Sequence, residues 1–196
     1  MIRIIGVAGR ICSGKSELTS ILRDCGFREI DVDAVGHAVL QDEVQAVAEA
    51  FGDDVLTGEG MVDRRALGRR VFTDRAALER LEAIVHPPMV ARVRSEIDSL
   101  PGDARIVINA ALLFHMGLHT VCDHAIVVRA WAPVRFLRAW RRDRHGIRST
   151  IARFRQQRSL SLSAEQVDIS IVGNSVTRGV LRRRVRGLLR ELHIDC

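Results

Sequence analysis

The chain has 196 residues, 47% of them hydrophobic, and a formal net charge of +6 at pH 7. This length suits one globular domain with a substantial core, and the sequence holds no run of 18 apolar residues, which excludes a membrane-spanning helix. The positive charge is compatible with nucleic acids, anionic lipids or polyphosphates as partners and does not select among them.

The four cysteines, Cys12, Cys25, Cys122 and Cys196, form no C-x-x-C pair and show no metal-ligand spacing. Such a pattern predicts reduced thiols in a cytoplasmic protein. No signal-peptide pattern precedes the first predicted strand, which agrees with that expectation.

A phosphate-binding motif lies close to the N-terminus. Residues 3–8 predict a short buried strand and residues 16–23 a helix; residues 9–16 between them read Gly-Arg-Ile-Cys-Ser-Gly-Lys-Ser and fit G-x-x-x-x-G-K-[ST]. Backbone N–H groups of such a loop wrap phosphates, which makes nucleotide-binding candidates of Gly9, Arg10, Ile11, Cys12, Ser13, Gly14, Lys15 and Ser16.

Two side chains of this motif carry specific chemistry. Lys15 is expected to reach the outer phosphates of ATP, and the Ser16 hydroxyl to bind Mg²⁺. Lys15 is also the only lysine among 30 basic residues. It stands where a compact ammonium fits and a planar guanidinium does not, which strengthens the prediction of a P-loop.

Two carboxylates lie at the end of the second predicted strand, residues 27–31. Asp31 and Asp33 come at its carboxyl end, the edge where open α/β sheets bind ligands. Asp33 is the candidate for general base or for orienting an acceptor hydroxyl; the alternative is an N-cap of the helix predicted from residue 33 to 40. Asp31 is a candidate contact to Mg²⁺-bound water, with a structural role as the alternative.

The rest of the chain alternates helices and strands, apart from one all-helical block. Helical spacing continues over residues 41–51, 63–72 and 74–100, with an interruption at Pro87-Pro88. Buried parallel strands are predicted at 105–110, 124–129 and 168–172, and helices at 133–143, 149–158 and 177–192.

This order predicts an α/β fold, a three-layer P-loop kinase with a parallel central sheet. We expect a single domain over residues 1–196. Its core comprises about 1–33, 101–132 and 159–196, its helical substrate-binding insertion about 34–100, and its basic lid about 133–158.

The predicted lid concentrates positive charge. Between residues 129 and 158 there are ten arginines and one acid, and Arg135, Arg138 and Arg142 share one stripe of the first lid helix. We predict that at least one of them contacts a phosphate, with catalytic roles for Arg138 and Arg142. A solvated charged face is the alternative.

Several segments together resemble the dephospho-CoA kinase family, which catalyses the last step of coenzyme A synthesis. They are residues 9–16, Asp31 and Asp33 followed by His37, and the Leu-Glu-Ala-Ile-Val-His-Pro segment at 81–87. The resemblance implies transfer of the ATP γ-phosphate to the ribose 3′-hydroxyl of dephospho-CoA, with Asp33 as catalytic base and Asn174 at the nucleotide. It also implies ATP, Mg²⁺ and dephospho-CoA as ligands, no nucleic-acid or membrane partner, and a monomer or weak homo-oligomer.

The sequence departs from the family pattern at five positions. Arg10 replaces a Gly, Asn109 an Asp, Ala111 a Pro, His115 a Glu, and Arg135 a Gln. An arginine at position 10 is expected either to crowd the loop or to reach a phosphate.

Three other functions are weighed against this one. The nearest is another P-loop kinase acting on a nucleoside, a nucleotide or a small alcohol. A GTPase is disfavoured because its guanine-reading N-K-x-D motif needs a second lysine. An RNA-binding module is suggested only by the arginine-rich stretch, which has few aromatic residues for base stacking.

Overall fold

The computed structural model describes residues 3–142, 167–175 and 177–196. The chain divides into two compact units. The first combines Met1–Asp31 with Pro101–Cys196, and the second is the continuous segment Val32–Leu100. The predicted second lid helix, at residues 149–158, lies outside the described residues.

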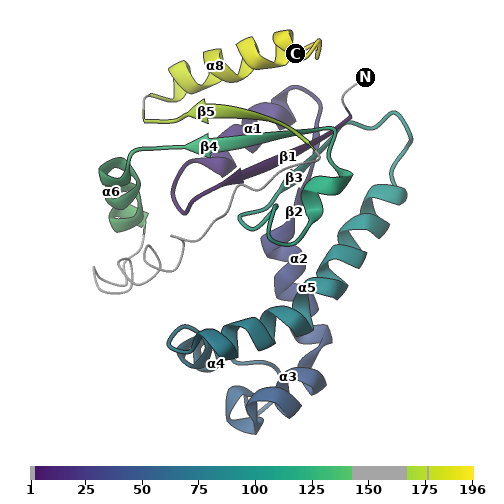
Figure 1. The fold of residues 1–196 in the computed structure, drawn as a ribbon, viewed down its shortest axis with the longest axis vertical. Coiled ribbons are helices and arrows are strands. Elements are labelled where there is room, and N and C mark those ends of the chain that lie inside the picture. Colours follow the sequence, from purple (N-terminus) through teal and green to yellow (C-terminus); the bar gives the residue numbers. More distant parts are fainter. Residues whose placement is uncertain (1–2, 143–166, 176) are drawn as a thin grey trace. The chain divides into compact units, whose positions relative to one another are not determined.

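A five-stranded parallel sheet forms the centre of the first unit (Figure 1), which confirms the predicted α/β class. The strand order is β2-β3-β1-β4-β5, so the motif-bearing β1 is central and β2 lies at one edge. β1, β3 and β4 are buried along nearly their whole length, as expected for parallel strands covered on both faces. The strands are β1 (Ile4–Gly9), β2 (Arg28–Asp31), β3 (Ile106–Asn109), β4 (His124–Arg129) and β5 (Asp168–Gly173).

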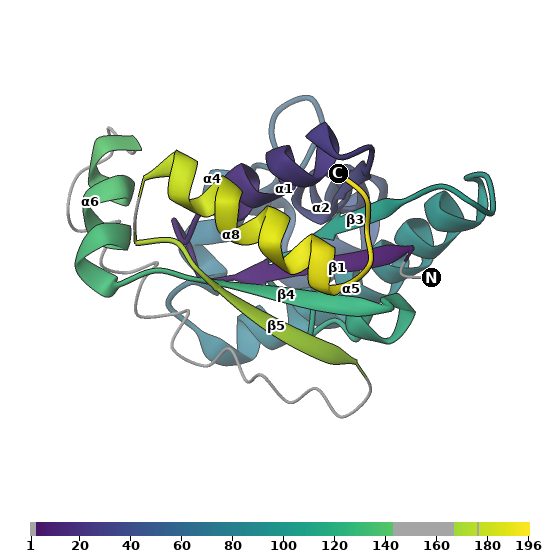
Figure 2. The same ribbon diagram turned by 90° about the horizontal axis from the view of Figure 1, so that it is seen from above.

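Two helices cover one face of this sheet, α1 (Lys15–Asp24) and α8 (Arg178–Glu191). Figure 2 shows α8 lying across the strands beside α1. Their apolar stripes share one core with alternate residues of β1, among them Ile5 and Val7. The opposite face meets the segment that follows β3. A Cβ at Gly6 would lie only 2.6 Å from Leu113 and 2.8 Å from Cys122, so glycine lets this segment approach closely.

The second unit is helical, as the sequence predicts. Its core gathers Val47, Phe51, Val55, Leu67 and Val71 from consecutive elements. The elements are α2 (Val32–Asp42), α3 (Val44–Phe51), a 3-10 turn η1 (Asp53–Val55), α4 (Arg64–Val71) and α5 (Arg75–Asp98).

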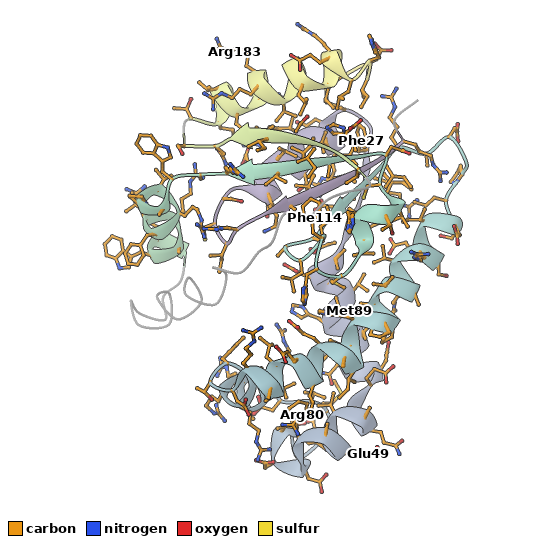
Figure 3. The ribbon with its side chains drawn as sticks, viewed as in Figure 1. Phe27, Glu49, Arg80, Met89, Phe114 and Arg183 are labelled. Carbon is orange, nitrogen blue, oxygen red and sulfur yellow. A yellow bond between two sulfur atoms is a disulfide. The ribbon has the colours of Figure 1, made fainter. Side chains whose placement is uncertain are left out.

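Two local predictions within this unit are wrong. α5 continues through Pro87 and Pro88 instead of breaking there. At this point α5 packs closely against α2: Met89 follows directly after the prolines (Figure 3), and a Cβ at Gly36 would lie 2.8 Å from its Cε. α2 begins at Val32, so Asp33 lies in the first turn rather than at the N-cap. A carboxylate in the first turn still complements the helix dipole.

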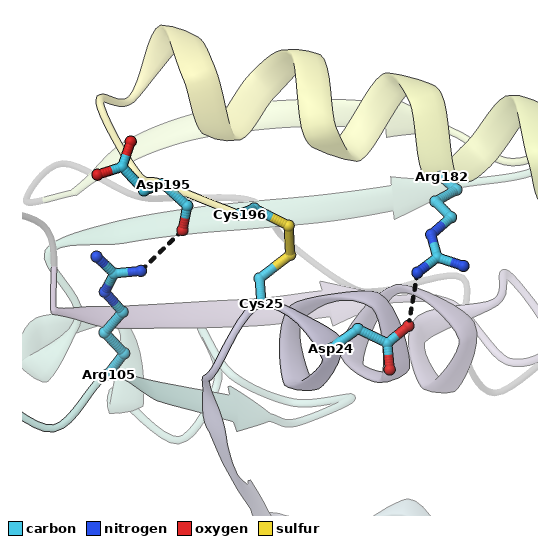
Figure 4. The surroundings of a disulfide bond; sticks show 6 residues. All are labelled: Asp24, Cys25, Arg105, Arg182, Asp195 and Cys196. Atoms are coloured by element: carbon cyan, nitrogen blue, oxygen red, sulfur yellow. Dashed lines mark hydrogen bonds and ion pairs between the residues drawn. A yellow bond between two sulfur atoms is a disulfide. The ribbon is translucent and has the colours of Figure 1, made fainter.

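The prediction of four reduced thiols is also wrong. Cys25, at the C-cap of α1, forms a disulfide with Cys196 (Figure 4). The two residues are 171 positions apart, and the packing of α1 beside α8 brings them together. Contacts nearby also hold the chain end, because Arg105 donates to the Asp195 carbonyl at 2.9 Å and Ile194 is buried. Cys12 and Cys122 are free, and burial raises the pKa of the Cys122 thiol to about 12, which keeps it protonated.

We expect reduction of this disulfide to destabilise the protein. The disulfide closes a long loop and so restricts the unfolded chain, which on the chain-entropy relation raises the free energy of unfolding by about 5 kcal/mol. Urea unfolding with and without dithiothreitol measures the loss. Cys196→Ser should unfold at the urea midpoint of the reduced wild type, with or without dithiothreitol. If the wild-type midpoint does not change under reductant, the prediction is contradicted.

A buried histidine makes stability depend on pH. His124, at the start of β4, is 5% exposed and lies 2.9 Å from the Ser170 hydroxyl. Burial lowers the pKa of His124, and the charge of Asp168 offsets this only in part. The unfolded chain therefore binds the proton more readily, so stability is complete above about pH 6.5 and falls as the pH drops below it.

We expect the melting temperature to fall between about pH 7.5 and pH 5.5, and to fall less in His124→Gln. The control is His193→Asn, since this exposed residue has a φ of 56° that Asn tolerates. Equal pH dependence in wild type and His124→Gln would refute the assignment.

None of the helices within the described residues is both long enough and apolar enough to cross a membrane.

Candidate active site

The loop between β1 and α1 folds as a compact turn. The Ser13 N–H donates to the Arg10 carbonyl at 3.0 Å, and the Leu18 N–H donates to the Gly14 carbonyl at 3.1 Å, which starts α1. Cys12 and Gly14 have positive φ angles of 56° and 99°. The chain thus reverses sharply at the end of a buried strand and enters a helix, and the partial positive charge of that helix N-terminus lies at the loop.

Two glycines of the motif are required by close approach. A Cβ at Gly9 would lie 2.6 Å from the Ser13 hydroxyl and 2.7 Å from the Val128 carbonyl. A Cβ at Gly14 would overlap the side-chain amide of Asn174. Both positions therefore exclude any larger residue, as the motif predicts.

Lys15 is the first residue of α1, and its ammonium folds back over the loop. Its Nζ donates to the Gly9 carbonyl at 3.1 Å, and the side chain is half-buried. The ammonium is thereby held against the loop from which the backbone amides would wrap a phosphate.

Three side chains distant in sequence donate hydrogen bonds to loop carbonyls. Arg135 Nε donates to Ile11 O at 2.9 Å, and Arg138 Nη1 donates to Ser13 O at 3.4 Å. Asn174 Nδ2 also donates to Ser13 O, at 2.9 Å, while its own backbone N–H is held by Arg129 O at 2.7 Å. These groups fix the outer side of the loop.

The sequence predicted phosphate contacts for the lid stripe and did not predict these bonds to the loop. Arg135 and Arg138 lie on α6 (Ala132–Arg142), three residues apart and on one face. Arg142 ends this helix, and its side chain lies outside the described residues. The amphipathic pattern of α6 gave no signal for the loop contact, because the buried residues of this helix are Arg135 and Ala139, whereas Leu137 and Trp140 are exposed.

Arg135 is 5% exposed. Burial lowers the pKa of its guanidinium; the neighbouring charge of Arg10 lowers that pKa further, and Cys12 partly opposes the shift. An arginine nevertheless stays protonated at neutral pH, so the site keeps a buried positive charge beside the loop.

A pocket of about 300 Å³ opens at the carboxyl ends of β1 and β4. Its walls are mainly apolar, and its charged groups are all arginines. The lining residues are Ala8, Gly9, Arg10, Ala111, Phe114, Val127, Val128, Arg129, Ala130 and Arg135.

The first of the two predicted carboxylates, Asp31, ends β2 and pairs in register with Asn109 at the end of β3. The side-chain amide of Asn109 donates to the Glu29 carboxylate at 2.9 Å, so this amide is engaged between the neighbouring strands β3 and β2. Asp31 thus shares the carboxyl edge of the sheet with the phosphate-binding loop. Asp33 follows two residues later as an exposed residue of the second unit, in the first turn of α2.

The donors around the loop fit a polyphosphate. Backbone amides, the Lys15 ammonium, two guanidiniums and a helix N-terminus all lie at one end of the sheet. The Ser13 hydroxyl is buried there and has no hydrogen-bond partner among the described residues. A set of N–H and O–H donors with positive charge among them suits an anion that has several acceptor oxygens.

Comparison with known proteins identifies the family. The model of the dephospho-CoA kinase family matches residues 3–178. The dephospho-CoA kinase of Anaeromyxobacter dehalogenans is 36% identical over 97% of this chain and 92% of its own length. That of Borreliella burgdorferi is 38% identical over 65% of this chain, and the match spans 62% of the relative.

Solved structures agree on the fold. The crystal structure of TT1252 from Thermus thermophilus superposes with a TM-score of 0.79 at 29% identity, covering 97% of this chain and 98% of that one. Dephospho-CoA kinase from Campylobacter jejuni gives 0.70 at 23% identity, covering 98% of each chain. The family model matches most of the sequence, and the match to the Anaeromyxobacter relative runs almost from end to end. The chain therefore belongs to the dephospho-CoA kinase family, a family of ATP-dependent kinases.

Proposed function

We propose that this chain transfers the γ-phosphate of ATP to the 3′-hydroxyl of the dephospho-CoA ribose, giving coenzyme A. The folded loop carries the proposal on the structural side, because its turn, its two sterically required glycines and the Lys15 ammonium together form a phosphate cradle. Family membership supplies the acceptor.

The nucleotide half of the site is assigned to the loop. The amides of residues 9–16 and the Lys15 ammonium would bind the outer phosphates, and Asn174 would keep the loop in its binding shape through Ser13. Ser16, exposed in the first turn of α1, would be a ligand of Mg²⁺, and Asp31 would contact a metal-bound water. When bound, Mg²⁺ would neutralise charge on the β- and γ-phosphates.

The acceptor half is assigned to Asp33. Its carboxylate would accept the proton of the 3′-hydroxyl as that oxygen bonds to the γ-phosphorus and the bond to the bridging oxygen breaks. Arg138, and Arg142 beyond it on α6, would stabilise the charge on the transferred group. The protein thus supplies position and charge, which are what phosphoryl transfer chiefly requires.

A coupled assay with ATP, Mg²⁺ and dephospho-CoA tests the proposal, with nucleoside monophosphates and shikimate as competing acceptors. We expect turnover with dephospho-CoA alone, and a product whose fragment masses place the new phosphate on the ribose 3′ oxygen. Phosphorylation of a nucleoside monophosphate without turnover of dephospho-CoA would replace this function by that of another P-loop kinase.

A further inference from the structure

One face of α2 holds the beginning of α4, within the helical second unit. Asp33, His37 and Gln41 follow one another at intervals of four residues, so their side chains leave the same face of α2. Nε2 of His37 lies 2.6 Å from Nη2 of Arg64, the first residue of α4. The Gln41 side chain donates to the Val62 carbonyl at 3.2 Å and accepts from the Val62 N–H at 2.9 Å. The face of α2 that carries Asp33 therefore also places the Arg64 side chain.

The backbone at the start of α4 is fixed a second time by its own cap. The Asp63 carboxylate accepts from the N–H groups of Arg65 at 2.8 Å and of Ala66 at 3.2 Å. These two hydrogen bonds are the main reason why the pKa of Asp63 is lowered, so the cap stays ionised at neutral pH. Arg64 thus projects from an ordered helix start and not from a loose loop.

The charge of Arg64 is held in place without being neutralised. A guanidinium only donates hydrogen bonds, so Nε2 of His37 is the acceptor and the imidazole is uncharged in this arrangement. No carboxylate of the described residues forms an ion pair with Arg64. The side chain is exposed, and the bond to His37 uses one of its five N–H groups. Arg64 therefore keeps its charge and most of its donors for an anion from solution.

This arrangement differs from that of other arginines in the same unit. Where those arginines lie at hydrogen-bond distance from another side chain within the described residues, the partner is a carboxylate. The pairs are Arg70 with Asp54, Arg75 with Glu79, and Arg92 with Asp42. A carboxylate partner occupies the same donors that would bind a phosphate, whereas a neutral imidazole only orients the guanidinium.

We propose that Arg64 binds a phosphate of the acceptor and that His37 is its positioning residue. The inference rests on the proposed function, in which Asp33 accepts the proton of the ribose 3′-hydroxyl. Cβ atoms four residues apart on a helix face are about 5–6 Å apart, so the side chain that holds Arg64 lies about one turn from Asp33. The diphosphate of dephospho-CoA is attached to the 5′ carbon of that same ribose, a few bonds from the 3′-hydroxyl. An acceptor with its hydroxyl at Asp33 can therefore place a phosphate oxygen on Arg64.

The chain offers matched variants for a test. Arg64→Gln removes the charge and keeps an amide that can donate to His37. His37→Ala removes the acceptor, and His37→Gln restores an oxygen that can accept from Arg64. Both positions are exposed, so these variants should fold. Arg65→Gln is the control, since this exposed neighbour on α4 faces a different side of the helix.

Titration calorimetry with dephospho-CoA, and separately with ATP, measures the affinities of the wild type and of each variant. We expect Arg64→Gln to weaken dephospho-CoA about tenfold or more, His37→Ala to weaken it by a smaller factor, and His37→Gln to bind nearly as the wild type does. ATP affinity should stay unchanged in all of them. In steady-state kinetics the KM for dephospho-CoA should rise with kcat nearly unchanged, because the contact is to a part of the acceptor that does not react. A merely structural bond between α2 and α4 would lower the melting temperature and leave KM in place.

Unchanged affinity for dephospho-CoA in Arg64→Gln overturns the proposal, and so does an equal loss in Arg65→Gln or a loss confined to ATP. If His37→Ala keeps full affinity while Arg64→Gln loses it, the positioning role of His37 is wrong.

Wild-type turnover is measured separately and decides the proposed function. Turnover with unchanged variant affinities removes only the role of Arg64. Binding of dephospho-CoA that weakens in Arg64→Gln, in a protein without turnover, removes only the phosphoryl transfer. A wild type that does not bind dephospho-CoA overturns both.

Discussion

Lys15→Ala is expected to reduce kcat/KM by at least about 10²–10³-fold while the protein stays folded. The ammonium lies over the loop at 3.1 Å from the Gly9 carbonyl, where it would stabilise charge on the outer phosphates. The side chain is half-buried and makes no part of the apolar core, so its loss should leave the melting temperature nearly unchanged. Steady-state kinetics and thermal melting test both halves of this expectation.

Lys15→Arg sharpens the same test. It preserves the charge but replaces a compact ammonium by a planar fork, and we expect it to be nearly as inactive as Lys15→Ala. Arg183→Ala, which removes an exposed charge from α8, is the control and should retain full activity (Figure 3). Near-normal turnover in Lys15→Ala would refute the assignment of the loop as the phosphate site.

Asp33→Asn is expected to lower kcat by about 10²–10⁴-fold, the usual range for loss of a general base. An amide cannot accept the hydroxyl proton. ATP should still bind, because the phosphate-binding loop consists of other residues. Single-turnover kinetics give the rate of the chemical step, and calorimetry gives the affinity for ATP.

The matched control is Glu49→Gln, the same loss of charge at an exposed position of α3 (Figure 3). It should leave the chemical step unchanged. If Asp33→Asn keeps a near-wild-type rate, Asp33 has no part in the proton transfer. If it instead loses ATP binding with kcat preserved, its role is in binding.

The motif and the parallel sheet were predictable because each follows from local patterns. The run of apolar residues before Gly9, the spacing of Gly14, Lys15 and Ser16, and the alternation of later strands with helices predicted the parallel sheet that the structure has. The family also followed from the sequence, since the segment at 81–87 adds a second, independent motif. The roles of Asp31, Asp33 and Arg142 stay predictions.

Features that depend on long-range packing were not predictable. The Cys25–Cys196 disulfide requires that α1 and α8 lie side by side, and no spacing rule connects positions 171 residues apart. α5 continues through two prolines where it packs against α2 at Gly36, and the sequence around the prolines does not show that packing. The bonds from Arg135 and Arg138 to the loop carbonyls depend on where α6 packs, so the sequence correctly located a cationic stripe without identifying its partners.

The strand order has a consequence for synthesis on the ribosome. β1 pairs with β3 and β4 and not with β2, so every partner of β1 lies beyond residue 100. The first 31 residues, which hold β1 and β2, therefore leave the exit tunnel before the strands that pair with them. The helical segment that follows has a core of its own and does not need those strands to form it. β1 therefore gains its strand partners only late in translation, and until then we expect its apolar stretch at residues 4–9 to be open to chaperones.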